Sequence, residues 1–280
     1  MDSHSAARRL PYLLLAPLLV FLAVFFLFPL AEVFALSFTD PEPGLENYRN
    51  FFSDPFYWRV LGVTFSTAGI VTLCCLLAGY PLAYFMAGAR RRYGNIALLV
   101  VALSYWTSFL VRTYAWMILL GNNGPVLGAL RALGWSSPPE LLFTRLSSTL
   151  AMVHVLVPLM AITLYSVMKK IDPVYVRAAC SLGARPWTAF CKVFFPQTLP
   201  GVINGCTMIF IICLGFYVIP VLLGSPREQM IAGVIGQQMD EMGNFGDAST
   251  MAVVLTLVTL LLYGIYSWWF DAHESQGAKK

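Results

Sequence analysis

The sequence predicts an all-α, polytopic membrane protein with six transmembrane helices. Hydrophobic residues make up 58% of the chain and charged residues only 11%, and the apolar residues form continuous rather than alternating runs. A helix that crosses the hydrocarbon core needs about 20 mostly apolar residues. Six segments meet this requirement: residues 11–36, 60–87, 95–120, 147–168, 201–223 and 249–270. This pattern excludes a soluble globular domain and a β-barrel.

The first apolar run follows Arg8 and Arg9, as the core of a signal peptide would. It is far longer than the roughly 7–15 residues of a signal core, and no small-residue cleavage site follows it. We therefore expect a retained first helix, with Glu32 as a boundary residue near its outer end.

Three loops on the outer side follow the first, third and fifth helices. In the first two, Pro and Gly residues bracket short helices that we expect at residues 45–52 and 126–133. No loop is long enough to form a domain of its own. We therefore expect a single transmembrane domain over residues 1–280.

The orientation follows from the basic residues. Twelve Lys and Arg residues fall on one side of the predicted membrane and five on the other. Cytoplasmic loops carry the excess of positive charge. We therefore expect both termini and the loop at 169–200 to be cytoplasmic. Acidic residues concentrate in the outer loops, which either attracts cations or reflects insertion alone.

The loop at 169–200 is predicted to form two helices joined by an elbow. Asp172 can cap a helix that begins at Pro173, and Gly183 suits the left-handed residue that ends it. Pro186 can open a second helix, which we expect Pro196 and Pro200 to end. The side chains expected to be exposed mix apolar and basic types: Val174, Val176, Arg177, Leu182, Arg185, Trp187, Phe190, Lys192 and Phe194. Such a surface indicates either a protein partner or a helix pair lying among lipid headgroups.

The spacing of Arg177-Ala178-Ala179, Gly183 and Val193-Phe194-Phe195-Pro196 resembles the EAA loop of permease subunits in binding-protein-dependent ABC importers. The resemblance implies the MetI-like architecture of type I importers. Residues 104–116, Leu120-Gly121 and residues 219–224 are similar to the first permease of spermidine/putrescine systems. The resemblance covers roughly residues 60–260.

In that family the loop is a coupling helix that docks in a groove of a separate ATPase. The resemblance assigns ATPase coupling to Arg177, Ala178, Ala179, Gly183, Ala184, Pro186 and Pro196. The family's Glu is replaced here by Arg177, so its contact cannot be carried over, because a guanidinium reverses the charge and changes the reach.

The resemblance also implies the partners. These are a second permease, expected to be a paralogue, two copies of a cytoplasmic ATPase that bind ATP and Mg, and an external binding protein. The chain would lie in the bacterial cytoplasmic (inner) membrane, with no cofactor, metal site or catalytic residue of its own. The implied solute is a polyamine or related organic amine, with a different small solute as the alternative.

Candidate pathway residues cluster in the third predicted helix. Arg112 is costly there unless it is paired or hydrated, and it is interpreted either as a pathway residue or as an interface arginine. The rings of Tyr105, Trp106, Tyr114 and Trp116 either bind an organic cation or belong to an aromatic belt.

The fifth predicted helix departs from the polyamine permeases. They often carry an acidic residue near Gly215, where this chain has Phe216 and Tyr217. Either the rings and the outer acids Asp240 and Glu241 recognise a cation, or the solute is not a polyamine.

Two other classes of protein stay open. A proton-coupled secondary transporter would require His154 or Glu32, and no inverted repeat supports it. A membrane-embedded enzyme would need converging polar side chains in the helices, and the sequence offers no such set, no P-loop and no Cys/His metal spacing.

Overall fold

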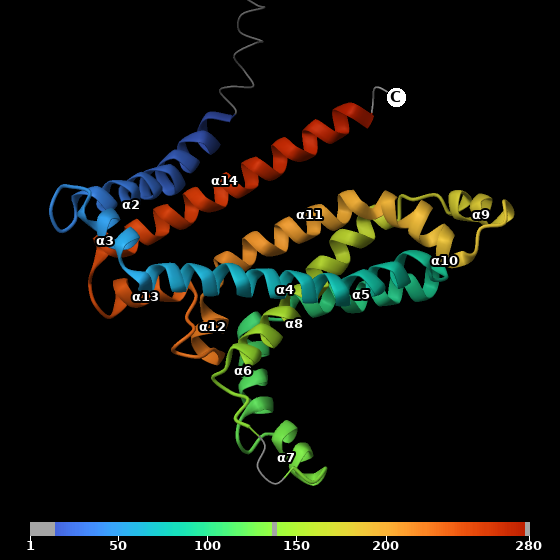
Figure 1. Cartoon of the computed structure of the whole chain (residues 1–280), viewed down its shortest axis with the longest axis horizontal. Coiled ribbons are helices and arrows are strands. Elements are labelled where there is room, and N and C mark those ends of the chain that lie inside the picture. The colour runs from blue at the N-terminus through green and yellow to red at the C-terminus, as the bar shows by residue number, and fades with distance from the viewer. Residues whose placement is uncertain (1–14, 136–138, 278–280) are drawn as a thin grey trace, which may run out of the picture. The chain divides into compact units, whose positions relative to one another are not determined.

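The computed structural model describes residues 15–135 and 139–277, and every regular element in these ranges is a helix (Figure 1). The all-α prediction is therefore confirmed. Contacts between residues divide the chain into two compact units. Unit 1 contains the described residues up to Trp58 and from Val234 onward, and unit 2 contains Arg59–Gly233.

Unit 1 is built on two long helices. The first, Leu15–Thr39, includes the π-helical turn η1 (Ala23–Leu27) and α2 (Phe28–Thr39). It packs along α14 (Phe245–Gly277), and the short α3 (Glu46–Ser53) also contacts α14. The loop after α2 is tied to both neighbours, since the Asn47 side chain donates to the Asp40 carbonyl at 2.7 Å and the Gly246 N–H donates to the Asp40 carboxylate at 2.8 Å. The predicted helix at 45–52 is confirmed as α3.

Unit 2 is organised around α8 (Arg145–Met168), which packs against several other helices. Its Met152, Met160 and Leu164 are completely buried. The partners of α8 include α5 (Arg91–Trp106), α6 (Phe109–Leu120), α11 (Phe195–Leu214) and α12 (Val218–Leu223). It also contacts α4 (Pro55–Gly88), whose Cys75 thiol donates to the Val153 carbonyl at 3.8 Å. Most of α4 lies in unit 2, and the remaining elements are α7 (Pro125–Ala132), α9 (Pro173–Ser181), α10 (Pro186–Ala189), η2 (Phe190–Phe194) and α13 (Ile231–Asp240), which continues into unit 1. The short helix expected at 126–133 is confirmed as α7.

Glycines let α8 and α11 approach closely. A Cβ atom on Gly201 would lie 2.9 Å from the Cβ of Val167, and one on Gly205 would lie 2.8 Å from the Met160 sulfur. Small residues at such contacts are typical of helix packing in membranes, where close van der Waals contact replaces the hydrophobic effect. Two hydrogen bonds join segments of unit 2 that are far apart in the sequence. The Ser147 hydroxyl donates to the Leu223 carbonyl at 2.6 Å, and the Ile231 N–H donates to Thr64 Oγ1 at 2.8 Å.

Five helices of the described chain are long and apolar enough to cross a membrane: Leu15–Thr39, Pro55–Gly88, Arg145–Met168, Pro186–Leu214 and Phe245–Ile265. A sixth span is reached if α5 and the helices at Phe109–Ala132 count as one, although they are bent by 88°. The prediction of one uninterrupted helix at 95–120 is therefore wrong.

Polar residues explain this bend. Thr107 and Ser108 separate α5 from α6 with extended ψ angles of 135° and 129°. Ser and Thr side chains compete with the backbone for hydrogen bonds, and the Thr107 hydroxyl donates to the Leu103 carbonyl at 3.2 Å. The hydrophobic average of the whole segment conceals this short polar interruption.

The helix predicted at 201–223 is also wrong in its bounds. The observed helix runs from Pro186 through η2 to Leu214, and it is followed by a break at residues 215–217 before α12. Pro196 and Pro200 therefore do not end it. A proline ring clashes with the carbonyl four residues earlier, and a π-helical turn, which is wider, immediately precedes Pro196.

Candidate functional site

The break between α5 and α6 is closed by Arg112. Its Nη2 donates to the Tyr105 carbonyl at 3.2 Å and to the Thr107 carbonyl at 2.7 Å. These are carbonyls at the C-terminal end of α5, where a cation is favourable because the helix dipole is negative there. Backbone groups released by a break in lipid must find partners inside the protein. Arg112, which lies in the next helix, supplies the hydrogen-bond donors for these carbonyls.

Arg112 is nevertheless left with unused donors. Only 8% of the residue is exposed, and its Nε and Nη1 atoms are buried without a hydrogen-bond partner. Among the residues that the structure describes, no carboxylate lies within ion-pair distance of it. Arg112 is thus held within unit 2 and does not extend to a lipid headgroup or pair with a described outer-loop acid.

A cavity of about 600 Å³, here called the break pocket, lies beside this arginine. It is lined by the α5–α6 break, by α8 and by the segment between α11 and α12, so two interrupted helices meet at it. Polar and aromatic side chains line it next to apolar ones: Tyr105, Thr107, Ser108, Phe109, Arg112, Val155, Leu156, Leu159, Ile212, Phe216, Tyr217 and Val218. Unsatisfied backbone at a broken helix is tolerated in membranes where it lines such a cavity.

Four of the nine predicted pathway residues line the break pocket: Tyr105, Arg112, Phe216 and Tyr217. Trp106 and Tyr114 are 86% and 54% exposed and are not among its lining residues. Trp116 instead donates from its indole nitrogen to His154 Nδ1 at 3.1 Å, which joins α6 to α8. Asp240 and Glu241 are exposed at the end of α13, in unit 1.

Three residues of the break pocket were not predicted from the sequence: Thr107, Ser108 and Phe109. The signal was present in the run Ser104-Tyr105-Trp106-Thr107-Ser108, which interrupts an apolar segment with three hydroxyl residues besides tyrosine. Such a cluster between periodic segments indicates a turn rather than a continuous helix.

The α9–α10 pair is the second candidate site. The Asp172 carboxylate accepts from the Val174 N–H at 2.8 Å, so Asp172 caps α9 as predicted. At the other end Gly183 has a φ of +87°. The Gly183 N–H donates to the Cys180 carbonyl and the Ala184 N–H to the Ala179 carbonyl, both at 3.0 Å. These two bonds form a Schellman motif, which requires the left-handed residue that glycine provides.

Fewer apolar side chains are exposed on the surface of this pair than the sequence predicted. Leu182 and Trp187 are 89% and 74% exposed, and Val174 is also exposed. By contrast, Val176, Phe190 and Phe194 are half-buried, so the expectation that all three are exposed is wrong. The reason is that these side chains pack inward and help to line a cavity.

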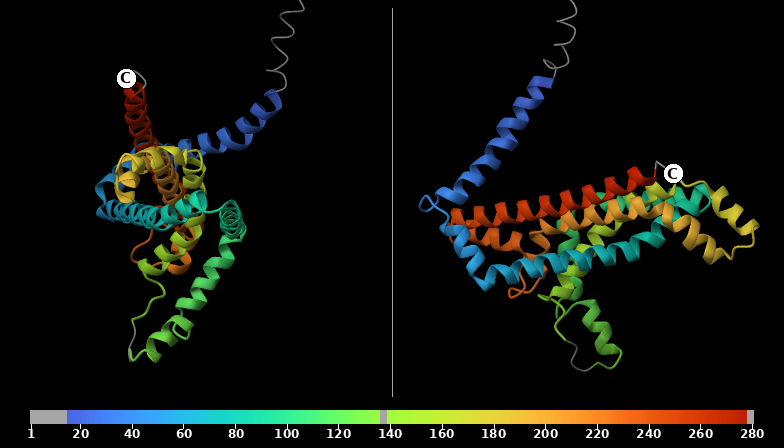
Figure 2. Two further views of the ribbon diagram at one scale, coloured as in Figure 1. Left: turned by 90° about the vertical axis from the view of Figure 1, so that its right-hand side faces the viewer. Right: turned by 45° about the horizontal axis from the view of Figure 1, so that its top comes forward.

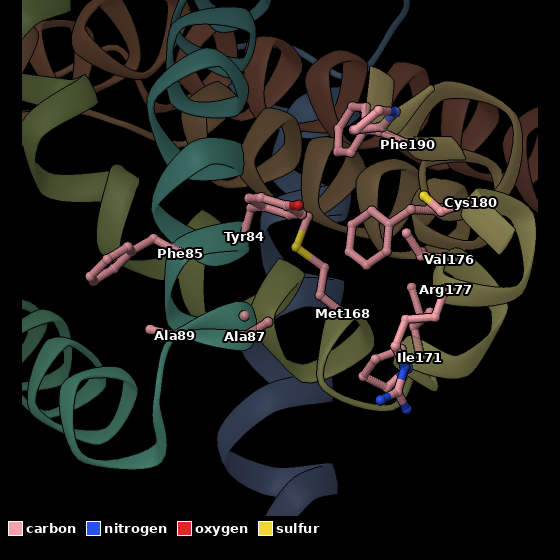
Figure 3. A pocket seen from close by; sticks show the side chains of 14 residues that line it. Tyr84, Phe85, Ala87, Ala89, Met168, Ile171, Val176, Arg177, Cys180 and Phe190 are labelled. Carbon is pink, nitrogen blue, oxygen red and sulfur yellow. The ribbon is translucent and has the colours of Figure 1, made fainter. Parts of the chain in front are cut away.

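This second cavity, here called the loop pocket, has a volume of about 590 Å³ (Figure 3). It lies among the C-terminal ends of α4 and α8 and the α9–α10 pair, and Tyr84, Phe85 and Met168 contribute to it. Of the residues assigned to ATPase coupling, Arg177 and Pro186 line this pocket. Figure 3 shows Arg177 beside Ile171, on the opposite side of the pocket from Phe85.

The other residues assigned to coupling lie nearby. Ala178 and Gly183 are exposed, Ala179 and Ala184 are half-buried, and Pro196 is the second residue of α11. The views in Figures 1 and 2 place the α9–α10 pair at one end of unit 2, away from α6 and α12. The two candidate sites are therefore separate.

No metal site is found in the part of the chain that the structure describes, since no three His, Cys, Asp or Glu side chains gather there. The six cysteines are free.

Comparison with known proteins agrees with this arrangement. Residues 79–276 match the family described as binding-protein-dependent transport system inner membrane component. The chain is 33% identical over 254 residues to the spermidine/putrescine transport system permease protein PotB of Haemophilus influenzae, covering 88% of both chains. It is 26% identical to a putative 2-aminoethylphosphonate transport system permease protein, PhnU, of Salmonella paratyphi A, over 90% of this chain and 89% of the relative.

Solved structures show the same fold. A chain of a bacterial ABC transporter involved in the import of the acidic polysaccharide alginate superposes with a TM-score of 0.79 at 18% identity, over 99% of both chains. A chain of the MetNI methionine ABC transporter superposes with a TM-score of 0.59 at 18% identity, over 78% of this chain and 98% of that one. The protein described here thus belongs to the family of binding-protein-dependent transport system inner membrane components, which are multi-pass transport subunits rather than enzymes.

Proposed function

We propose that the chain is a permease subunit of an ATP-driven importer and that the break pocket belongs to its solute pathway. The observation that carries this proposal is that two interrupted helices meet at one cavity of about 600 Å³. In secondary transporters, substrate sites are typically formed by discontinuous helices, because broken helices present free backbone groups to a solute, and the same physical reason applies to a broken helix in an importer. The volume lies within the usual range for small-molecule sites, roughly 300–1,000 Å³.

The pathway requires a second permease, expected to be a paralogue. The described apolar helices leave many large side chains exposed, including Leu73, Leu77, Leu103 and Ile118. Lipid covers some of this surface, and a partner helix bundle covers the rest. All residues from 1 to 280 are assigned to one transmembrane domain in this proposal, with both termini and the loop at 169–200 on the cytoplasmic side.

The loop at 169–200 is proposed to be the coupling loop. It would dock on one of two copies of an ATPase subunit, which bind ATP and Mg and drive the change between inward-open and outward-open states. Support comes from the exposure of Leu182 and Trp187 at the elbow, since large exposed apolar side chains mark interaction sites. Arg177 makes no ion pair with a described residue and offers a positive charge at this surface.

The solute is proposed to be a polyamine or a related organic amine, delivered by an external binding protein. Relatives named for spermidine/putrescine and for 2-aminoethylphosphonate transport share an amine in their solutes. In the break pocket, Tyr105, Phe216 and Tyr217 offer aromatic rings to such an amine.

Reconstitution tests the proposal. The chain should co-purify with a second permease and an ATPase. Proteoliposomes of this complex should take up an organic amine only when ATP is present on the side of the membrane that carries the ATPase and binding protein is present on the opposite side. An ATPase variant that binds but does not hydrolyse ATP is the matched control and should abolish uptake. Uptake by the chain alone, driven by a proton gradient, would contradict the proposal and support the secondary transporter.

A further inference from the structure

We infer that the break pocket accepts an amine solute that also carries an anionic group, and that Arg112 is the residue that meets this group. The inference rests on the proposed function, because it assumes that the break pocket is part of the solute pathway. Of the two solute classes proposed above, it selects the related organic amines over the polyamines and identifies them as amino-carboxylates and aminophosphonates. The geometry of Arg112 and the composition of the pocket carry it.

The charge of Arg112 has no counter-ion among the described residues. Unit 2 contains only three acidic residues, Glu140, Asp172 and Glu228, and none of them lines the break pocket. A buried charge is costly unless it is paired, because a low-dielectric interior solvates it poorly. An anion that enters the pocket would supply the missing partner.

The guanidinium also has donors to spare. It uses Nη2 for the Tyr105 and Thr107 carbonyls, whereas Nε and Nη1 are without partners. A guanidinium presents five N–H groups in a fork that matches a carboxylate or phosphonate in two-point contact. Nε and Nη1 are covered in this structure, so the guanidinium must turn toward the pocket for them to reach a solute oxygen.

The N-terminus of α6 favours an anion at the same place. Helix α6 has twelve residues, and its N-cap Ser108 makes no side-chain capping bond to the first turn. Ser108 and Phe109 both line the break pocket. The free N–H groups and the positive end of the helix dipole attract negative charge. The end of α6 thus provides a second source of positive potential in the pocket, independent of the charge of Arg112.

The pocket is poorly suited to a solute with two amines. One amine can lie against the rings of Tyr105, Phe216 or Tyr217, but no described lining residue is acidic and could bind the other. The second amine of a diamine would approach Arg112, and like charges repel. In a zwitterion of the same length, the acidic group takes that position and the repulsion becomes attraction.

The test compares putrescine with 4-aminobutyrate, which have the same four-carbon chain and differ in one terminal group. Equilibrium binding of each radiolabelled solute is measured on the whole complex in proteoliposomes. Binding protein is omitted, so that the permeases alone determine the affinity for each solute. We expect 4-aminobutyrate to bind at least about 10-fold more tightly, the factor typical of one charged hydrogen-bonded contact. Arg112→Gln should bring the ratio close to one, and Arg112→Lys should preserve part of it.

Arg131→Gln is the matched control, since Arg131 lies in the last turn of α7 and does not line the pocket. It should leave the ratio unchanged. Tighter binding of putrescine, binding of neither solute, or an unchanged ratio in Arg112→Gln would overturn the inference. If Arg112→Gln does not assemble, the wild-type ratio and Arg112→Lys still decide. ATP-dependent putrescine uptake with a reversed ratio would overturn this inference alone, whereas uptake without ATP dependence would overturn the proposed function as well.

Discussion

The α9–α10 elbow and the α5–α6 break both join two helices of unit 2, but different interactions hold them. The elbow is closed by backbone bonds between residues at most five positions apart, and it depends on the φ of +87° at Gly183. The break is closed by the side chain of Arg112, which reaches back from the next helix to Tyr105 and Thr107. One turn is thus encoded in backbone conformation and the other in a buried charge.

This difference determines which substitutions each turn tolerates. The elbow should accept any residue that adopts the left-handed conformation, whatever its charge, because a Cβ on Gly183 meets nothing within 4 Å. The break should accept residues that favour an interrupted helix at Thr107 and Ser108 and reject changes that interrupt its flanking helices.

The largest expected effect concerns proline in and beside α6. Ala115→Pro, in the middle of α6, should destabilise the protein by about 3 kcal/mol, because the ring removes a helical hydrogen bond and clashes with the preceding turn. Ser108→Pro should be tolerated or should stabilise it by about 0.4–1 kcal/mol, because Ser108 already has a φ of −51° and Thr107 is extended.

Thermal unfolding of the purified complex measures this pair, with the wild type as reference. Equal destabilisation by the two prolines would contradict the break and restore the uninterrupted helix that the hydropathy pattern predicts. The two variants therefore separate a structural turn from a flexible point in a continuous span.

The same contrast explains what the sequence could predict. Asp172, Pro173, Gly183 and Pro186 act on their own neighbours, so their positions alone predicted α9, the elbow and the start of α10. The break pocket depends on side chains from α5, α6, α8 and α11 that meet only after packing. Arg112 was singled out as unusual, but its bonds to Tyr105 and Thr107 require the bend that the apolar average concealed.

Proline was the least reliable signal along the chain. Pro186 begins a helix, whereas Pro196 and Pro200 lie within one, because η2 precedes them and packing against α8 maintains the helix. A tertiary contact thus overrides a local preference. No local pattern at Gly201 reveals that contact, which only the structure shows.

The next largest effect is expected where α8 and α11 pack closely against each other. Gly201→Ala should destabilise the protein by about 1–3 kcal/mol, because the new methyl group would lie 2.9 Å from Val167. Gly69→Ala in α4 is the control, since nothing lies within 4 Å of its Cβ position, and it should be neutral or slightly stabilising. Thermal unfolding measures both. A harmless Gly201→Ala would show that the helices are less tightly packed than described.

The elbow is tested by Gly183→Val. A β-branched residue in the left-handed region costs about 1–2 kcal/mol, and escape from that conformation breaks the bonds to Ala179 and Cys180. We expect ATP-dependent uptake to fall about 10-fold while the chain still inserts in the membrane, since 1.4 kcal/mol corresponds to a factor of ten.

Gly183→Asn is the matched control for this variant. Asparagine adopts the left-handed conformation more readily than other residues with a Cβ, so most uptake should return. Co-purification of the ATPase with each variant shows whether the loss of uptake arises from weaker binding of the ATPase to the elbow. Normal uptake in Gly183→Val would remove the coupling assignment from the elbow.

The smallest effect is expected at His154, which accepts a hydrogen bond from Trp116 at 3.1 Å and thereby joins α6 to α8 beyond the break. If this bond only positions α6, His154→Gln should retain it through the amide oxygen, and His154→Leu should cost about 0.5–1.5 kcal/mol of stability. ATP-dependent uptake should stay within about two-fold of the wild type in both variants, a change that corresponds to less than 0.5 kcal/mol. A proton relay makes the opposite demand, because neither glutamine nor leucine can carry a proton, so both variants would lose uptake. Uptake measured with and without a protonophore separates the two roles.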